Sequence, residues 1–485
     1  MIFNRLMRVF FTLGLSVVVH SAALATDDDY VLFNAQLIDP ATRTLTQGGW
    51  VQVVAGKIAD LGEGEGPRAT RRIDLGGAYV MPGLIDAHMH LTAGPLSVAM
   101  EAGAPKISMK SQAAVTRFHA QAALASGVTS AFSPAGDPEA NHAYREQQRA
   151  GTLVGPALTY AGLSFEPMAI EGGTVYPTSV EGWRAELARQ KALGVSHIKL
   201  YHGLSGDELR QGIAMANEAG LKSIAHLDQV SWQFAVDAGV DVLTHALMPT
   251  ADLLPEAARA DYSASLKPGM TQYLYRWFEL VDYDAAPMQQ LFASLAKQKV
   301  RVDLTLVVNE LMYFYPRLGE LYPETAWQQH PTIAQSWQRN LGMSLYHWTE
   351  EDFVRAQAVF PKVLELLTRL DRAGVPLLLG SDSYSAGSWF WRELVLHQRA
   401  GIDPWTILQM VTSRAAHELA LGSVGRLEKN YVADLVVMPA NPLVDVHAVQ
   451  GVTQVIQGGQ LFDVHQLRTD LEQMATDIQL SQQEQ

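Results

Sequence analysis

A short stretch near residue 86 has the residue types and spacing of a metal site. It reads Pro82-Gly83-Leu84-Ile85-Asp86-Ala87-His88-Met89-His90. Side chains alternate between the two faces of a strand, so Asp86, His88 and His90 share one face and their apolar neighbours share the other. Two imidazoles then lie side by side. Such a pair also occurs by chance, so a metal site requires further ligands elsewhere in the chain.

Four later β-rich runs also end in histidine or in charged side chains. These are Lys199 in 195–201, His226 in 221–227, His245 at the end of 240–245 and Asp382 at the end of 375–382. A strand buried on both faces is normally apolar, so a lysine, histidine or aspartate within it needs a partner. Divalent ions such as zinc accept neutral imidazole and carboxylate oxygen, and a catalytic site keeps room for water. Together with His88 and His90, the pattern predicts one metal centre built from five strands.

These runs belong to eight β-rich segments that alternate with helical stretches. The helical stretches end at glycine and a strand follows, as in Ala219-Gly220-Leu221, which is typical of a left-handed helix cap. The predicted strands are 85–90, 128–132, 157–161, 195–201, 221–227, 240–245, 300–306 and 375–382. Eight β/α units indicate the α/β class and a (β/α)8 TIM barrel, with its active site at the C-terminal ends of the strands. A doubly wound open sheet is the alternative.

The two ends of the chain differ from this repeat. Short β-rich runs separated by glycine turns occupy 26–81 and return at 425–470, so we expect a small β-sandwich domain formed by both chain ends. The barrel then spans 82–424, and 471–485 forms a tail. Two aromatic-rich insertions, near 247–288 and 307–350, are too long for plain connections. We expect them to form lids or pocket walls, or helical hairpins that pack on themselves or on a partner subunit.

Composition limits the possible partners. The chain has 485 residues, a net charge of -14 and no cysteine. Nucleic-acid binding needs clustered Lys and Arg, and no such cluster occurs, so nucleic acid is not an expected partner. Without cysteine, any metal must be held by histidine, carboxylate or another nitrogen or oxygen ligand.

The first 25 residues have the pattern of a signal peptide. Arg5 and Arg8 precede an apolar run over 9–19, and Ala23-Leu24-Ala25 provides the small residues of a cleavage site. We predict cleavage after Ala25 and a periplasmic or secreted protein. An N-terminal membrane anchor is the weaker alternative, because the run is shorter than the roughly 20 residues that a span needs. No later stretch is apolar enough, so we expect no stable membrane span in the mature chain.

The stretch Gly83 to His90 resembles the first-strand signature of the amidohydrolase superfamily, and the later candidate ligands match in order and spacing. The resemblance covers nearly the whole mature chain, because 77–83 and 425–437 are similar to the two halves of the β-sandwich of that superfamily. Ile198-Lys199-Leu200-Tyr201 is most similar to its imidazolonepropionase-like and Xaa-Pro dipeptidase-like branch. The aromatic insertions have no counterpart that we can place.

The resemblance implies a binuclear centre of two divalent metal ions, with Zn²⁺ as the expected metal. His88 and His90 would hold the first ion with Asp382, and His226 and His245 would hold the second. Lys199 would be carboxylated and bridge both ions, because a carbamate is an anion with two oxygens whereas an ammonium cannot bind metal. Asp382 would take a proton from the bridging water.

The expected reaction is hydrolysis. Two metal ions lower the pKa of a shared water, so a metal-bridging hydroxide would cleave an amide C-N bond of a peptide-like or N-acyl small molecule. A lactonase or phosphoesterase on the same binuclear site is the alternative. A non-catalytic barrel protein would show a lost ligand, and none is lost. The resemblance also allows a homo-oligomer, and the sequence identifies no substrate-binding residue.

Overall fold

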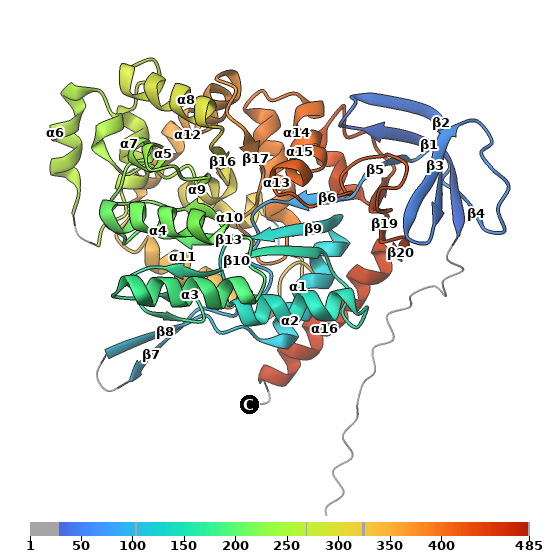
Figure 1. Ribbon diagram of the computed structural model, residues 1–485, viewed down its shortest axis with the longest axis horizontal. Coiled ribbons are helices and arrows are strands. Elements are labelled where there is room, and N and C mark those ends of the chain that lie inside the picture. The colour runs from blue at the N-terminus through green and yellow to red at the C-terminus, as the bar shows by residue number, and fades with distance from the viewer. Residues whose placement is uncertain (1–28, 102–103, 268, 323–324, 484–485) are drawn as a thin grey trace, which may run out of the picture.

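The computed structural model describes residues 29–101, 104–267, 269–322 and 325–483 (Figure 1). The predicted signal peptide, 1–25, lies outside the described residues. Within these ranges, no helix is long and apolar enough to cross a membrane. The described chain forms a barrel and an adjoining sheet, which have different sequence patterns.

Eight parallel strands form the barrel. In chain order they are β6 (Leu84–Asp86), β9 (Val128–Ser133), β10 (Ala157–Phe165), β13 (His197–Leu200), β14 (Lys222–Ala225), β15 (Val242–Thr244), β16 (Arg301–Asp303) and β17 (Leu377–Leu378), each paired with the next. Backbone hydrogen bonds from Ala87 N to Leu379 O (3.1 Å) and from Asp382 N to His88 O (2.8 Å) join the chain after β17 to the chain after β6. The sheet therefore closes, which confirms the predicted (β/α)8 barrel and excludes the open sheet.

Several strands end earlier than their sequence patterns predict. Strand β6 ends at Asp86, β15 ends at Thr244 and β17 ends at Leu378. At the mouth the backbone turns away from strand geometry, and His245 and Asp382 have φ values of +66° and +54°. Positive φ is incompatible with a strand, so these candidate ligands lie just beyond the strand ends.

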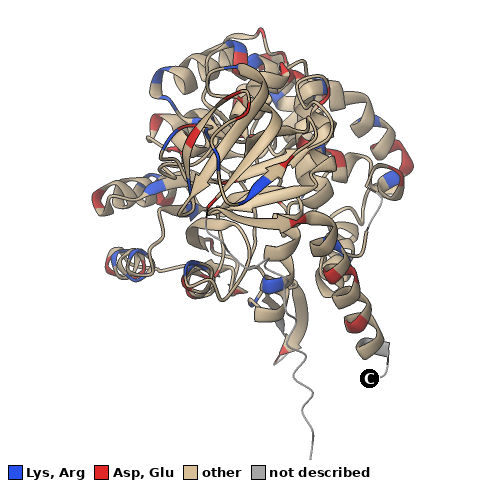
Figure 2. Cartoon of the chain, turned by 90° about the vertical axis from the view of Figure 1, so that its right-hand side faces the viewer, with Lys and Arg blue, Asp and Glu red and all other residues tan. Residues whose placement is uncertain are grey.

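Helices cover the outside of the barrel (Figure 1). They are α1 (Ala113–Ala125), α2 (Pro138–Arg149), α3 (Val180–Ala192), α4 (Gly206–Ala219), α5 (Trp232–Asp237), α8 (Ala286–Gln298), α12 (Glu350–Arg372), α13 (Gly387–Arg399), α14 (Pro404–Met410) and α15 (Ser413–Glu418). Helix α4 starts at a capping box, because Ser205 Oγ accepts from Glu208 N while the Glu208 carboxylate accepts from Ser205 N. Acidic and basic residues are interspersed along the helices that Figure 2 shows.

The second domain is one eight-stranded sheet with the order β20-β19-β18-β5-β1-β2-β3, in which β4 also pairs with β1. Its strands are β1 (Tyr30–Asp39), β2 (Thr44–Val54), β3 (Lys57–Glu63), β4 (Arg72–Asp74), β5 (Tyr79–Pro82), β18 (Leu435–Met438), β19 (Gln454–Gln457) and β20 (Gln460–Asp463). Leu32, Val51, Val80 and Leu435 share one buried cluster. Both chain ends therefore form this domain. The antiparallel pairing of β5 with β18 joins the strands of the two chain ends into one sheet.

The long connections fold as helices at the barrel mouth. After β15 come η1 (Ala251–Leu253), α6 (Glu256–Ser265) and α7 (Tyr273–Leu280), and after β16 come α9 (Leu306–Tyr313), η2 (Tyr315–Arg317), α10 (Leu318–Leu321) and α11 (Pro331–Ser344). The sequence patterns did not predict a protruding hairpin of β7 (Ser97–Glu101) and β8 (Ala104–Ser108), which β11 (Ile170–Glu171) extends (Figure 1). A short strand, β12 (Thr174–Val175), pairs with β10.

The C-terminal residues form a packed helix, where we expected a tail from 471. After η3 (Val446–Gly451), helix α16 runs over Val464–Gln483. Leu471 and Ala475 are fully buried. The Arg468 guanidinium lies 4.6 Å from the centre of the Trp327 ring and donates to Ala125 O at 3.1 Å. An apolar stripe with a cation-π contact therefore holds this segment against the barrel.

Candidate active site

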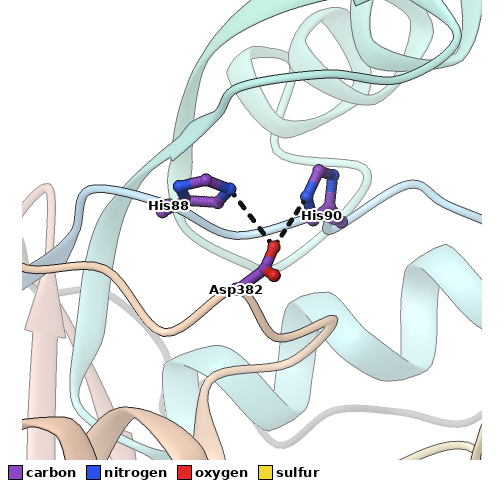
Figure 3. Close-up of side chains that lie close together, drawn as sticks. All are labelled: His88, His90 and Asp382. Atoms are coloured by element: carbon purple, nitrogen blue, oxygen red, sulfur yellow. Dashed lines mark hydrogen bonds and ion pairs between the residues drawn. The ribbon is translucent and has the colours of Figure 1, made fainter. Parts of the chain in front are cut away.

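The structure brings two histidines and one aspartate into direct contact at the barrel mouth. Asp382 Oδ1 lies 3.2 Å from His88 Nε2 and 3.0 Å from His90 Nε2 (Figure 3). One ligand atom from each of the three side chains lies within 4.8 Å of the others. The contact arises because the chain after β17 pairs with the chain after β6, where His90 N donates to Ser383 O at 2.7 Å.

The other ring nitrogen of His88 contacts a carboxylate that the sequence patterns did not single out. His88 Nδ1 lies 2.7 Å from Asp303 Oδ2, and both side chains are buried. Because a carboxylate only accepts, Nδ1 carries the proton and Nε2 is the nitrogen that faces Asp382. Asp303 is the last residue of β16, in Arg301-Val302-Asp303. A carboxylate at the end of a barrel strand was therefore the sequence feature that could have identified Asp303 as a site residue.

His90 and His245 are oriented in the same manner. His90 Nδ1 lies 3.3 Å from Ala135 O, which only accepts. His245 Nδ1 lies 2.8 Å from Thr305 Oγ1, whose own hydrogen bond runs to Leu304 O at 2.8 Å. In both residues Nδ1 is therefore the donor, and Nε2 of His90 faces Asp382 Oδ1 at 3.0 Å. Metal-ligating histidines typically have such a buried partner, which accepts from the ring nitrogen that does not bind the metal.

His226 lies beside His245 and completes a cluster of four imidazoles. The ring centroids of His226 and His245 are 4.4 Å apart, and those of His245 and His88 are 5.0 Å apart. Within the described chain, the buried Nδ1 of His226 has no hydrogen-bond partner. Burial lowers the pKa of both His226 and His245 well below the ordinary value, so both rings are neutral. Neutral imidazole is the form that binds a metal.

Lys199 is a fully buried side chain of β13 that lines the same space. Its Nζ donates a hydrogen bond to Thr244 Oγ1 at 3.4 Å and lies 5.8 Å from the centre of the Tyr201 ring. Burial lowers the pKa of Lys199 to about 8, although the charges of Asp382 and Asp303 oppose the shift. The amine is therefore unprotonated in a larger fraction of molecules near neutral pH than an exposed lysine would be, although the protonated form still predominates.

The donor set fits divalent metal ions. His88 Nε2 and His90 Nε2 face Asp382 Oδ1 with lone pairs on both sides, so a proton or a cation must lie between them. Burial lowers the pKa of His88, but the charge of Asp382 and the Asp303 hydrogen bond outweigh it and raise the value to about 9. The carboxylates of Asp382 and Asp303 thus favour positive charge on His88. A metal ion would supply that charge in place of the protons between the two histidines and Asp382.

The six candidate ligands lie at the floor of a pocket of about 330 Å³. Five of them line it, and His88 lies fully buried beneath. The walls include Met109, which follows β8, and Ile170 of β11. They also include Leu311 and Trp337 from the second insertion and Tyr384 after β17. The second insertion therefore contributes a pocket wall, whereas the first contributes Leu247 alone among the described lining residues.

Comparison with known proteins agrees with this architecture. Two models of the amidohydrolase family match residues 71–152 and 353–462. An adenine deaminase from Dehalococcoides mccartyi (strain CBDB1) is 37% identical over 106 residues, which are 22% of this chain and 18% of the deaminase. The match thus spans under a fifth of that relative.

Solved structures share the whole fold. A Xaa-Pro dipeptidase with bound methionine in its active site has a TM-score of 0.64 at 17% identity, over 90% of this chain and all of the dipeptidase. A bottromycin amidohydrolase has a TM-score of 0.68 at 19% identity, over 93% of this chain and 91% of its own. The fold is thus a closed barrel with a histidine and aspartate cluster at its mouth that could hold a metal ion. Residues 71–152 and 353–462 of this chain are thus similar to the amidohydrolase family.

Proposed function

We propose that this protein is a metal-dependent hydrolase that cleaves an amide C-N bond of a peptide-like or N-acyl small molecule. The observation that carries the proposal is the convergence of six candidate ligands at the floor of one pocket. The matches to the amidohydrolase family support it, and so do the adenine deaminase and the bottromycin amidohydrolase that this chain is similar to, since their names denote action on C-N bonds. A pocket of about 330 Å³ suits a small substrate.

In this proposal, His88, His90 and Asp382 hold one divalent ion, and His226 and His245 hold a second. Zn²⁺ is the proposed metal, because the ligands are imidazole and carboxylate. When bound, such ions supply Lewis acidity and a water of lowered pKa.

Lys199 is the proposed bridging ligand, in carboxylated form. Its unprotonated amine adds to the carbon of carbon dioxide and loses one proton, which leaves a carbamate anion with two oxygens. The lowered pKa of the buried side chain supports this step, because only the unprotonated amine is nucleophilic.

Asp382 is the proposed proton carrier. Burial raises the pKa of its carboxyl, but the positive charge of His88 and the hydrogen bonds from the two histidines outweigh burial and lower it well below the ordinary value. Asp382 is therefore ionised near neutral pH, so a carboxylate oxygen can accept a proton from the attacking water and deliver it to the leaving nitrogen.

The test combines metal analysis, peptide mass and substrate panels on the purified protein. We expect about two metal ions per chain, a carbon dioxide adduct on the peptide that contains Lys199, and hydrolysis of amides. About one ion with unmodified Lys199 would overturn the bridging role. Activity confined to lactones or phosphotriesters would replace amide hydrolysis with the alternative reaction on the same site.

We also propose that the protein is exported and cleaved after Ala25. Arg5, Arg8 and the apolar run over 9–19 support this. Mass spectrometry of the protein isolated from its natural source should give Thr26 as the first residue, and an intact N-terminus would refute the proposal.

A further inference from the structure

The pocket wall above the candidate ligands is apolar and aromatic. Leu311 of α9, Trp337 and Leu341 of α11 and Trp389 of α13 form one side of it. The Trp337 and Trp389 rings meet edge to face, with centroids 4.6 Å apart and an interplanar angle of 63°. This pair offers a large apolar surface to a bound group.

Charge in the pocket is confined to its floor. Among the described residues that line it, Lys199 and Asp382 are the charged side chains apart from histidine, and both belong to the candidate ligands. The arginines of α13, the helix that carries Trp389, are held by a carboxylate behind the wall. Arg392 donates two hydrogen bonds of 2.6 Å to the buried Glu310, and Arg399 lies 3.4 Å from the same carboxylate.

We infer that the pocket selects substrates whose group bound against Trp337 and Trp389 is uncharged and apolar, and that it rejects a free carboxylate there. A carboxylate moved from water to this wall would lose its hydration without gaining a cation. This inference rests on the proposed function and narrows its substrate class. The preferred substrates are N-acyl amides without a free carboxylate, rather than dipeptides or N-acyl amino acids.

Two matched probe pairs test the inference on the metal-loaded protein. The first pair is N-aroyl arylethylamides with either a methyl group or a carboxylate at the para position of both rings, so that one substituted ring must enter the pocket whichever half of the molecule binds. Their kcat/KM values are compared. The second pair is the corresponding sulfonamides, which resist hydrolysis, and their Kd values are measured by calorimetry.

We expect the dimethyl amide to exceed the dicarboxylate at least about 100-fold in kcat/KM, and the sulfonamides to differ by a similar factor in Kd. Equal kcat/KM values for the two amides would overturn the inference and leave the proposed function intact. Selective sulfonamide binding without hydrolysis of either amide would support the inference and count against the proposed function. Equal Kd values for the sulfonamides would overturn the inference even if neither amide were hydrolysed.

A variant pair tests the role of charge directly. Ser344 is exposed at the end of α11 and lines the pocket, so a longer side chain fits there without disturbing the core. Ser344→Arg is expected to improve Kd for the dicarboxylate sulfonamide at least about tenfold, because it provides a cation. Ser344→Gln, which adds length without charge, is expected to preserve the wild-type selectivity. An equal gain in both variants would show that charge is not the basis of selection.

Discussion

Replacing Asp303 by asparagine should weaken metal binding without removing a proposed metal ligand. Asp303 Oδ2 lies 2.7 Å from His88 Nδ1 and keeps the proton on that nitrogen, so that Nε2 faces Asp382. An asparagine amide can present its NH2 group to Nδ1 instead. The His88 proton then moves to Nε2, which is the nitrogen proposed to bind the metal.

The structure sets the size of this effect. The side chains of His88 and Asp303 are 0% and 2% exposed, so no water can replace the lost hydrogen bond. Loss of a partner of a metal-ligating histidine typically weakens metal affinity 10- to 100-fold, which is about 1.4 to 2.7 kcal/mol. Because asparagine also favours the wrong tautomer, we expect the upper end for Asp303→Asn, about 100-fold.

The assay is competition for zinc between the metal-depleted protein and a chromophoric chelator, with circular dichroism to confirm folding. Asp434→Asn is the matched control, because Asp434 is also a buried aspartate and accepts from Gly458 N at 2.7 Å in the sheet domain. It should leave the zinc Kd unchanged. A wild-type Kd in Asp303→Asn, or an equal loss in Asp434→Asn, would refute the reasoning.

Three further predictions address the bridge, the pH dependence and the packing. Lys199→Ala should lower the metal content from about two ions to about one per chain by atomic emission, and an unchanged content would refute its role as a ligand. Burial raises the pKa of Asp434 to about 6, so the folded state holds a proton that the unfolded state has released. Stability should therefore fall by about 3 kcal/mol as the pH rises from about 4 to above 6, and urea unfolding should show a smaller fall in Asp434→Asn. Gly380→Ala would place a Cβ 2.2 Å from His88 Cβ. It should lower both the melting temperature and the zinc affinity, whereas Gly319→Ala, which meets open space, should preserve both.

The barrel was predictable because its signals are local. Glycine after most of the helices that precede a strand, and an apolar run after each such glycine, define a β/α unit over a few residues, and eight β/α units leave few topologies. The set of candidate ligands was predictable for the same reason, because parallel strands bring their C-terminal ends to one rim. These ligands are His88, His90, Lys199, His226, His245 and Asp382. The structure brings all six side chains to that rim.

Other features depend on contacts that sequence periodicity does not encode. Asp303 is 215 residues from His88 in the sequence. The pattern of alternating residues around Asp303 in its short strand would be the same if its carboxylate faced solvent. Asp86 was expected on the same face as His88 and His90, but the strand ends there. Its carboxylate accepts from His88 N at 3.0 Å and Ser381 N at 3.1 Å, and so it holds the two rim segments together. Burial raises the pKa of Asp86 to about 7.

Backbone strain links the fold to the site. His245, Thr305 and Asp382 have φ values of +66°, +42° and +54°, which cost L-residues about 1 to 2 kcal/mol each. Such strain persists only where the surroundings enforce it. Here His245 N donates to Asp303 O and Asp382 N donates to His88 O, both at 2.8 Å, so that neighbouring strand ends hold His245 and Asp382 in place. The left-handed turns direct the His245 and Asp382 side chains into the mouth, and the closed barrel itself therefore sets the direction of the candidate ligands.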